Sequence, residues 1–522
     1  MSKKKKYIPL AILIIFSIYC SLTTSRSLDE YYHLMIGKSV LDYLLSLGQI
    51  DKYIDYREYY SPIYWSFQYF ISEIFPLKYE VQSIHLINLI FSLSAIFAIG
   101  KVCKELFNKK VGKIVFLILF FYPIFFGHMS INNKDTILAF SHVWIVYLVF
   151  RYLKKQEFRE KINKYIITIS LLAALATGIQ LAFLGSQIPI VFFLLIEIFI
   201  FKKIINKKFL KKRFFFDFIK CFLLFYLFLI LFWIDVHQNI IIEPFAIIQK
   251  WLSSDLITGW PYILLNGNYY LSFEGVPALY FIINYIYKSP EYILILYVIF
   301  LILFFTSRKF YESKFKFFNY KLTFVFLMLL FPNLIIIFIP SPVNDGLRLF
   351  LWVLPYFCIV PGLTVFFLLE NFNNIISKIT SVVISIFVIY YLFNFVLLTP
   401  YHYTYLNFLS GKAELKYQKF ENDYWAISIG ELIKKVNFRT DELIKIGTCG
   451  FISTSPKPYL KNRPNIKYKF VHADKADYII MTNRVSRHHG VMNCFDIFKG
   501  EDIAAVKRNG MTLSLIRKIK TF

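Results

Sequence analysis

Long apolar runs occupy most of the sequence and limit what the chain can fold into. A helix that crosses a lipid bilayer needs roughly 20 mostly apolar residues, and eleven runs approach or reach that length. The hydrophobic fraction, 57% of 522 residues, agrees, because soluble domains average about 45–50% apolar residues. We therefore expect a polytopic α-helical membrane protein with about eleven transmembrane helices. The runs lie near residues 7–24, 81–100, 114–130, 136–153, 165–184, 188–203, 214–234, 291–307, 322–340, 349–369 and 379–398.

Charge predicts how these helices are oriented. The net charge of +26 would suit a nucleic-acid-binding protein, but the basic residues are concentrated in short strips between apolar runs. The N-terminus and four strips hold 27 lysines and arginines, and all five segments fall on one side if eleven spans alternate. Cytoplasmic loops carry such an excess, so we expect these segments in the cytoplasm and no nucleic-acid partner. The strips are 101–113, 151–164, 202–213 and 308–321.

The opposite side should carry two long loops and a folded tail. Segment 24–80 has five basic and eight acidic residues, and 235–290 has two and four. Within the first loop, residues 33–48 have apolar positions at helical spacing, which indicates an interfacial helix. The tail contains "LIKIGTCGF" and "ADYIIMTN", which alternate as strands do, and "ISIGELIKKV", which is typical of a helix.

This pattern predicts two domains. Residues 1–398 would form the transmembrane domain, and 399–522 a small α/β domain that an odd number of spans places outside the cytoplasm. The localisation that we expect is the bacterial inner (cell) membrane. An organisation of this kind makes membrane lipids immediate partners of the chain.

Charged residues in three outer turns are the candidates for chemistry. Asp29 and Glu30 follow the first apolar run, Asp135 lies between the third and fourth, and Asp345 and Arg348 precede the tenth. Each turn is tightly tethered, so all three lie at one membrane face. A carboxylate can take a proton from an attacking hydroxyl or amine, and a guanidinium can hold a phosphate through paired hydrogen bonds. The alternatives are equally compatible with each turn: a solvated helix end for Asp29 and Glu30, and local salt bridges, Asp135–Lys134 and Asp345–Arg348, for the other two.

Several ordered motifs resemble the GT-C superfamily of membrane glycosyltransferases. The resemblance is to the family 39-like branch that includes protein mannosyltransferases and lipid A aminoarabinose transferases, and it runs over roughly residues 25–435. It implies an inverting transfer of a sugar from a polyprenyl-phosphate donor to an acceptor outside the cytoplasm. The segments that carry it are "LDEYYH", "FFGHMSINNKDTILAF", "NGNYY", "YKSP", "NDGLRLFLWVLP" and "YLNFLSGKAELKYQKFENDYWAIS".

The resemblance also implies roles for five charged residues. Asp29 would be the catalytic base, with Glu30 beside it, and Asp135 would shape the site. Lys134 and Arg348 would bind the donor phosphate. A divalent cation, Mg²⁺ or Mn²⁺, could be bridged by Asp29 and Asp135 to a phosphate oxygen, although the sequence does not require one.

Other residues would line the same cavity. His128 and Asn133 are implied by the resemblance, and Tyr269 and Tyr270 either form the floor of a sugar site or anchor the chain at the membrane interface. Relatives often have His-Pro-Pro in the first outer loop, where this sequence has Tyr60-Ser61-Pro62. The acceptor therefore stays open among a lipid, a glycan and a protein.

Two alternatives to an enzyme remain. A flippase or transporter of a lipid-linked saccharide should place charges near mid-membrane on broken helices, whereas the acids here lie at the ends of apolar runs. An inactive scaffold that presents the tail domain is the other alternative, and the presence of Asp29 and Arg348 disfavours it.

The tail contains two cysteines, Cys449 and Cys494. An extracytoplasmic domain permits a disulfide between them. They are equally compatible with two buried free thiols, because no spacing rule requires that they pair.

Overall fold

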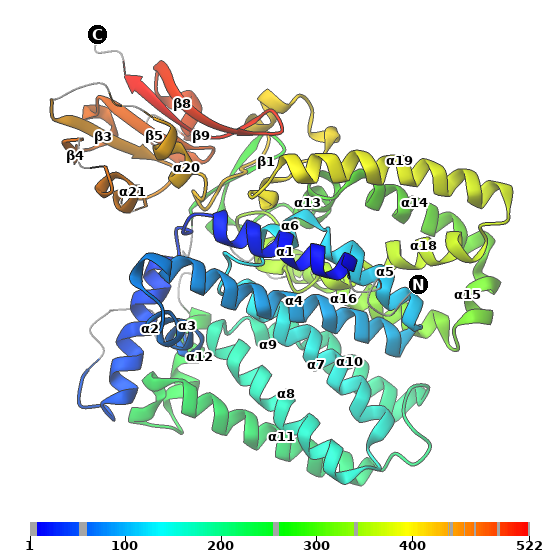
Figure 1. Cartoon of the computed structure of the whole chain (residues 1–522). Coiled ribbons are helices and arrows are strands. Elements are labelled where there is room, and N and C mark those ends of the chain that lie inside the picture. Colours follow the sequence, from blue (N-terminus) through cyan, green and yellow to red (C-terminus); the bar gives the residue numbers. More distant parts are fainter. Residues whose placement is uncertain are drawn as a thin grey trace.

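The computed structural model of the chain describes residues 8–51, 60–253, 260–338, 343–436, 438, 442–453, 455–463, 466–487 and 491–519. Long helices lie alongside one another and form an elongated bundle, and an α/β domain sits at one end of it (Figure 1). The N-terminal end of the first helix points away from this domain.

Each of the eleven apolar runs is helical, but several of the helices are broken. The run after α4 is interrupted before Pro123, which lacks a backbone N–H and begins a new helix. The helices in the runs are α1 (Ile8–Thr23), α4 (Glu80–Leu106), α5 (Lys109–Phe120), α6 (Pro123–His128), α7 (Asp135–Lys155), α8 (Arg159–Ile179), α9 (Phe183–Ser186), α10 (Ile188–Ile196), α11 (Lys211–Phe232), α14 (Glu291–Thr306), α16 (Phe318–Phe338), α17 (Leu354–Phe357), α18 (Ile359–Glu370) and α19 (Ile375–Leu397).

The expected count of eleven transmembrane helices is not confirmed. Among the described residues, seven helices are long and apolar enough to cross a membrane, or eight if the pair α13 (Tyr280–Lys288) and α14 counts as one span bent by 116°. The first helix and the α17–α18 segment are apolar but shorter. The chain is an integral membrane protein, and its spans are less regular than the hydropathy of the sequence suggests.

Short elements cover the end of the bundle that faces the α/β domain. They are α2 (Glu30–Leu45), α3 (Ile63–Ser72), α12 (Glu243–Ser253) and a hairpin of β1 (Tyr262–Leu265) and β2 (Asn268–Leu271). The first of these helices is the one expected over residues 33–48. Asn266 and Gly267 have φ values of 51° and 89°, as the Asn-Gly turns of tight hairpins require.

The C-terminal domain is built on a five-stranded sheet with the order β4-β3-β5-β9-β8. Strands β4, β3 and β5 pair in parallel. Strand β9 pairs antiparallel with both of its neighbours, β5 and β8. Helix α20 (Ile429–Lys435) packs its buried side chains into the core of the sheet. The strands are β3 (Ile444–Cys449), β4 (Tyr468–Phe470), β5 (Tyr478–Thr482), β8 (Gly500–Arg508) and β9 (Met511–Ile519). Both strand predictions and the helix prediction for the tail are confirmed.

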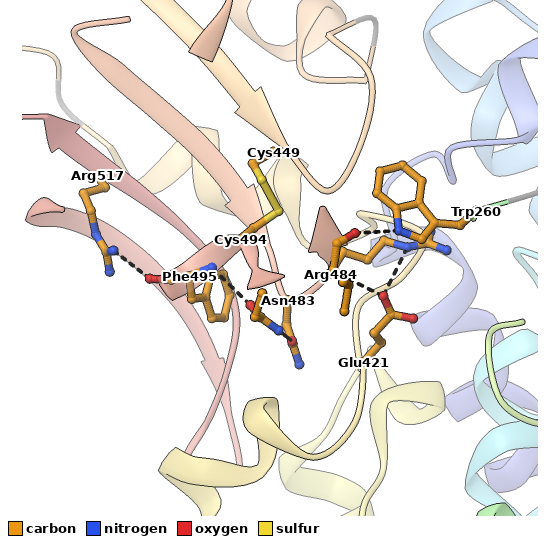
Figure 2. The surroundings of a disulfide bond; sticks show 10 residues. Trp260, Glu421, Cys449, Asn483, Arg484, Cys494, Phe495 and Arg517 are labelled. Atoms are coloured by element: carbon orange, nitrogen blue, oxygen red, sulfur yellow. Dashed lines mark hydrogen bonds and ion pairs between the residues drawn. A yellow bond between two sulfur atoms is a disulfide. The ribbon is translucent and has the colours of Figure 1, made fainter. Parts of the chain in front are cut away.

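A disulfide joins Cys449 at the end of β3 to Cys494, with their Cα atoms 5.7 Å apart (Figure 2). The second cysteine follows a small hairpin of β6 (Val485–Arg487) and β7 (Val491–Asn493) and begins the short helix α22 (Cys494–Ile497). The pairing predicted as one of two possibilities is therefore the one found.

The α/β domain is docked on the bundle rather than tethered beside it. Ile131, in the turn between α6 and α7, is buried in the same apolar cluster as Ile446 and Ile480 of the sheet. Trp425 belongs to this cluster too. The docking brings the outer turns of the bundle against the segment that leads into the domain.

Candidate active site

Arg348 is the centre of a cluster of charged side chains at the end of the bundle beneath the α/β domain. Its Nη1 lies 2.5 Å from Asp345 Oδ2, its Nε 3.2 Å from Asp135 Oδ2, and its Nη2 3.7 Å from Asp29 Oδ2. The indole ring of Trp425 covers the guanidinium, with Cζ 4.7 Å from the ring centroid. Four segments that are distant in the sequence thus meet at one cation, as the three outer turns were expected to do.

A tight turn presents Asp345 to the cluster. Asp345 and Gly346 both lie in the left-handed region, with φ values of 56° and 66°, a conformation that Asp tolerates better than most residues. A side chain at Gly346 would collide with the ammonium of Lys288 and come within 3.0 Å of Asn284 Oδ1. The turn therefore needs glycine both for its backbone and for the space in front of it.

Asp135, the first residue of helix α7, is held by Asn132 in the turn that precedes the helix. The side-chain oxygen of Asn132 accepts hydrogen bonds from the Asp135 N–H at 2.8 Å and the Lys134 N–H at 3.2 Å. The Asn132 amide also donates to Asp135 Oδ2 at 3.0 Å. A carboxylate in the first turn of a helix is favoured by the helix dipole. The second oxygen of Asp135 is buried without a hydrogen-bond partner among the described residues, so it can accept a bond from a ligand.

Asp29 is the most accessible of the three carboxylates. Its side chain is 39% exposed, whereas those of Asp135 and Asp345 are 2% exposed. Burial acts to raise the pKa of Asp29, but the positive charges of Arg348, His33 and Lys134 outweigh it and the pKa lies below its ordinary value. Asp29 is therefore ionised at neutral pH and can be reached by a molecule from solvent.

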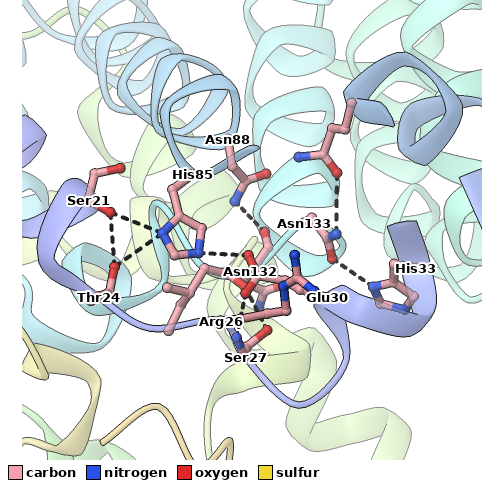
Figure 3. A network of polar contacts seen from close by, with 12 residues as sticks. Ser21, Thr24, Arg26, Ser27, Glu30, His33, His85, Asn88, Asn132 and Asn133 are labelled. Carbon is pink, nitrogen blue, oxygen red and sulfur yellow. Dashed lines mark hydrogen bonds and ion pairs between the residues drawn. The ribbon is translucent and has the colours of Figure 1, made fainter. Parts of the chain in front are cut away.

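Glu30 turns away from this cluster, although it is the next residue. Its Oε1 lies 2.9 Å from His85 Nε2 on α4, and its Oε2 accepts from the Ser27 N–H at 2.5 Å (Figure 3). The His85 ring also contacts the backbone oxygen of Ser21 at 3.0 Å. Consecutive residues on a helix point in different directions. Glu30 thus fastens the start of α2 to α4, and the structure does not bring it to Arg348.

Asn133 and His33 lie on another side of the site. The sequence analysis predicted Asn133 as a lining residue and did not predict His33. His33 Nδ1 lies 2.7 Å from Asn133 Oδ1, and its ring stacks on Trp65 at 3.9 Å between centroids. The Trp65 indole N–H donates to the Asn133 carbonyl at 3.1 Å. The signal for His33 was present, because Asp29 and His33 are four residues apart and share a helix face.

Lys134 follows Asn133 in the chain, and its Nζ lies 3.5 Å from the Tyr60 hydroxyl and 5.1 Å from the centre of the Tyr60 ring. It does not touch Arg348, but its charge acts on Asp29. The local Asp135–Lys134 salt bridge considered from the sequence is replaced by this contact with Tyr60, whereas the Asp345–Arg348 pair is present.

His128 joins the cluster from below, since its Nε2 lies 2.7 Å from the Tyr424 hydroxyl and its ring meets Trp425 edge-on at 5.1 Å. The two tyrosines of the hairpin lie elsewhere. The Tyr269 hydroxyl reaches the backbone of Asn493 in the α/β domain, and Tyr270 packs against the apolar core of the bundle. The structure therefore brings His128 to the Arg348 cluster but directs the two hairpin tyrosines to other surroundings.

The carboxylates do not form a metal site as they are arranged. In the described ranges of the chain, no group of three or more His, Cys, Asp or Glu side chains could hold a metal ion. Mg²⁺ demands near-octahedral oxygen ligands, but Asp135 and Asp345 direct oxygens at Arg348, and the guanidinium stands between Asp29 and Asp135. The predicted cation bridged by Asp29 and Asp135 is not confirmed.

The profile of one known protein family matches part of the chain. The sequence profile of dolichyl-phosphate-mannose–protein mannosyltransferases matches residues 61–234, about a third of the chain, which includes Asp135 but neither Asp29 nor Arg348. No curated protein sequence matches the chain.

The fold is similar to that of a solved protein along almost the whole chain. ArnT from Cupriavidus metallidurans bound to undecaprenyl phosphate aligns over 99% of this chain and 98% of its own, with 10% identity and a TM-score of 0.50. The apo form of the same protein aligns over the same shares, with 11% identity and a TM-score of 0.51. The GT-C resemblance expected from the sequence is thus confirmed at the level of the fold.

Proposed function

We propose that this chain is a glycosyltransferase that moves a sugar from a polyprenyl-phosphate donor to an acceptor on the extracytoplasmic side of the membrane. The observation that carries the proposal is the contact of Arg348 with one accessible and two buried carboxylates. The mannosyltransferase profile over 61–234 and the ArnT-like fold support it. The solved ArnT structure that holds undecaprenyl phosphate makes a lipid phosphate the natural donor group to test.

In this mechanism Arg348 binds the donor phosphate. A guanidinium offers a planar fork of donors that matches two phosphate oxygens. Trp425 stacks on its face and Asp345 holds one edge, so the fork is fixed in one plane before the donor arrives. As the sugar leaves, negative charge grows on the phosphate, and Arg348 stabilises that charge more in the transition state than in the bound donor.

Asp29 acts as the base. The acceptor oxygen or nitrogen attacks the anomeric carbon, the bond from that carbon to the phosphate oxygen breaks with its electron pair, and the acceptor proton moves to Asp29. The lowered pKa of Asp29 keeps it ionised and ready. The lowered pKa also makes the Asp29 carboxylate a weak base. The acceptor proton therefore moves to Asp29 only as the new bond to the anomeric carbon makes that proton more acidic. Asp135 would accept a hydrogen bond from a hydroxyl of the sugar or of the acceptor through its unpartnered oxygen.

The proposed side of the membrane rests on charge. The basic strips should face the cytoplasm, and the N-terminal end of α1 points away from the α/β domain (Figure 1). A reporter that works only in the cytoplasm, fused at the C-terminus, should be silent. Activity of that reporter would place the Arg348 cluster on the cytoplasmic side and would exclude an acceptor on the extracytoplasmic side.

The function itself can be tested without knowing the sugar. The purified protein in lipid nanodiscs should bind undecaprenyl phosphate, the product of the reaction, and Arg348→Ala should weaken that binding. Cells that hold only Asp29→Asn should accumulate a polyprenyl-phosphate sugar that mass spectrometry of membrane lipids identifies. Wild-type protein that does not bind the lipid phosphate, or cells without accumulated donor, would contradict the proposal. The accumulated lipid would also name the sugar.

A further inference from the structure

We propose that Arg484 of the α/β domain is a positioning residue for Arg348. It would act through Asp345, so that the donor-phosphate site is complete only when this domain is docked. The inference rests on the proposed function, because it assigns to Arg348 the binding of the donor phosphate. It adds to that function a contribution from a domain that lies outside the membrane helices.

The central observation is that one carboxylate joins two guanidinium groups. Asp345 Oδ2 lies 2.5 Å from Arg348 Nη1, and Asp345 Oδ1 accepts from Arg484 Nη2 at 2.7 Å. The three side chains are 2%, 13% and 3% exposed in the order Asp345, Arg348 and Arg484. Ion pairs this well shielded from solvent interact strongly, and removal of one partner leaves the other charge uncompensated.

Arg484 is itself held rigidly between β5 and β6. Its Nη1 donates to the Tyr424 carbonyl, its Nε lies 3.8 Å from Glu421 Oε1, and its guanidinium lies 4.5 Å from the Trp260 ring centroid (Figure 2). The Trp260 indole N–H donates to the Val485 carbonyl at 2.8 Å, and Glu421 accepts from the Val485 N–H at 3.1 Å. Arg484 is thus a fixed reference point on the domain.

The same side chain also touches the second support of Arg348. Trp425 stacks on the Arg348 guanidinium, and Arg484 bonds to the carbonyl of the residue before it, Tyr424. Asp345 at one edge and Trp425 on the face therefore define the plane of the Arg348 guanidinium. Arg484 bonds directly to Asp345 and to the residue next to Trp425.

Loss of Arg484 should weaken donor binding for an electrostatic reason as well. Asp345 now divides its charge between two cations. Without Arg484 the whole charge faces Arg348 and competes with the donor phosphate for it, in surroundings where water screens little. The expected result is poorer donor affinity although no group that touches the donor has changed.

The test compares Arg484→Gln with a matched control in the same domain. Arg517 pairs with Asp502 at 2.6 Å and donates to the Phe495 carbonyl at 2.8 Å, so it also bonds a carboxylate and a backbone oxygen, but within the domain. With undecaprenyl phosphate in nanodiscs as the probe, Arg484→Gln should raise Kd roughly tenfold, as expected for one charge-assisted hydrogen bond in a buried network. Arg517→Gln should leave Kd unchanged.

A double-mutant cycle separates positioning from general loss of structure. If Arg484 acts through Arg348, Arg484→Gln should have almost no effect on Kd when Arg348→Ala is already present. Arg484→Lys should restore most of the affinity, because the ammonium still shares the charge of Asp345. Should Arg484→Gln fail to fold, Arg484→Met, which keeps much of the length of the side chain without its charge, carries the same cycle.

The outcomes distinguish this inference from the proposed function. Either of two results would overturn the positioning role and leave the function intact. In the first, Arg348→Ala weakens binding of the lipid phosphate and Arg484→Gln does not. In the second, Arg484→Gln changes Kd equally with and without Arg348→Ala. Wild-type protein that fails to bind undecaprenyl phosphate would overturn the function itself.

Discussion

Arg348 Nη2 and Asp29 Oδ2 lie 3.7 Å apart, close enough for charge attraction but beyond the usual 2.7–3.2 Å of a hydrogen bond. Asp345, in contrast, is bonded to the same guanidinium at 2.5 Å. The accessible acid is therefore attracted to the cation without being fastened to it, which leaves it able to turn toward an incoming nucleophile.

Asp29→Asn should reduce sugar transfer by about 10²–10⁴-fold, the usual contribution of general acid–base catalysis. The amide keeps the size of the side chain but cannot take the proton. Binding of undecaprenyl phosphate should change little, because the carboxylate that is replaced already lies beyond hydrogen-bonding distance of Arg348. Turnover close to wild type in a transfer assay would move the base to Asp135.

Arg348→Ala should weaken donor affinity by roughly 10–150-fold, since a hydrogen bond to a charged group contributes about 1.5–3 kcal/mol. Arg348→Lys should recover only part of it, because an ammonium lacks the planar fork and the flat face that Trp425 covers. The measurement is Kd for the lipid phosphate in nanodiscs. Equal affinity of the Ala variant and the wild type would mean that Arg348 only ties the outer turns together.

Glu30→Gln should behave differently from the neighbouring Asp29→Asn. It breaks the buried pair with His85, and removal of one partner of such a pair costs about 3–5 kcal/mol. The melting temperature in detergent should fall, while kcat should fall far less than in Asp29→Asn. A loss of kcat as large as that of Asp29→Asn, with an unchanged melting temperature, would return Glu30 to the catalytic site.

Glu421 should make stability depend on pH. Burial raises its pKa from 4.5 to about 7, against the opposing charge of Arg484. Between these values the folded chain keeps a proton that the unfolded chain releases, so the stabilisation is full below pH 4.5 and is lost as the pH rises to about 7. Glu421→Gln should remove this step from the difference in melting temperature between about pH 5 and about pH 8. Parallel profiles for the two proteins would show that the group does not titrate in this range.

Alkylation should detect the disulfide directly. In denaturant without reductant, the four cysteines Cys20, Cys103, Cys221 and Cys358 should react, and prior reduction should add Cys449 and Cys494. Reduction should also destabilise the α/β domain by about 2–4 kcal/mol. It should loosen Arg484 as well, whose carbonyl accepts from the Cys494 N–H at 2.8 Å. Six reactive thiols without reductant would contradict the bond.

The sequence was most informative where a short turn fixes the position of a charged residue. Asp29, Asp135 and Arg348 each stand at the end of an apolar run, and the bundle leaves them little freedom other than to meet at one face. The side chain of Glu30 was not predictable in the same way, because its direction depends on the 100° step of α2 and on a histidine 55 residues later.

The contributions of the α/β domain could not be read from the sequence. Arg484 and Trp425 reach Arg348 and its partner only through docking of the domain on the outer turns, and no local pattern encodes that contact. Tyr269 shows the reverse, since a turn composition that suited a sugar site serves a hairpin that faces Asn493.

The bridge from Asp345 to Arg484 has a consequence for how the chain matures. The two residues are 139 positions apart, and at about 5–20 residues per second roughly 7–30 s of synthesis separate them. During that time helices α17, α18 and α19 are completed, and Asp345 pairs with Arg348 without its second guanidinium partner. A ribosome that stalls in this interval would leave an anchored chain in which Asp345 lacks Arg484, and under the proposed role of Arg484 the donor site would stay incomplete until the last domain has folded.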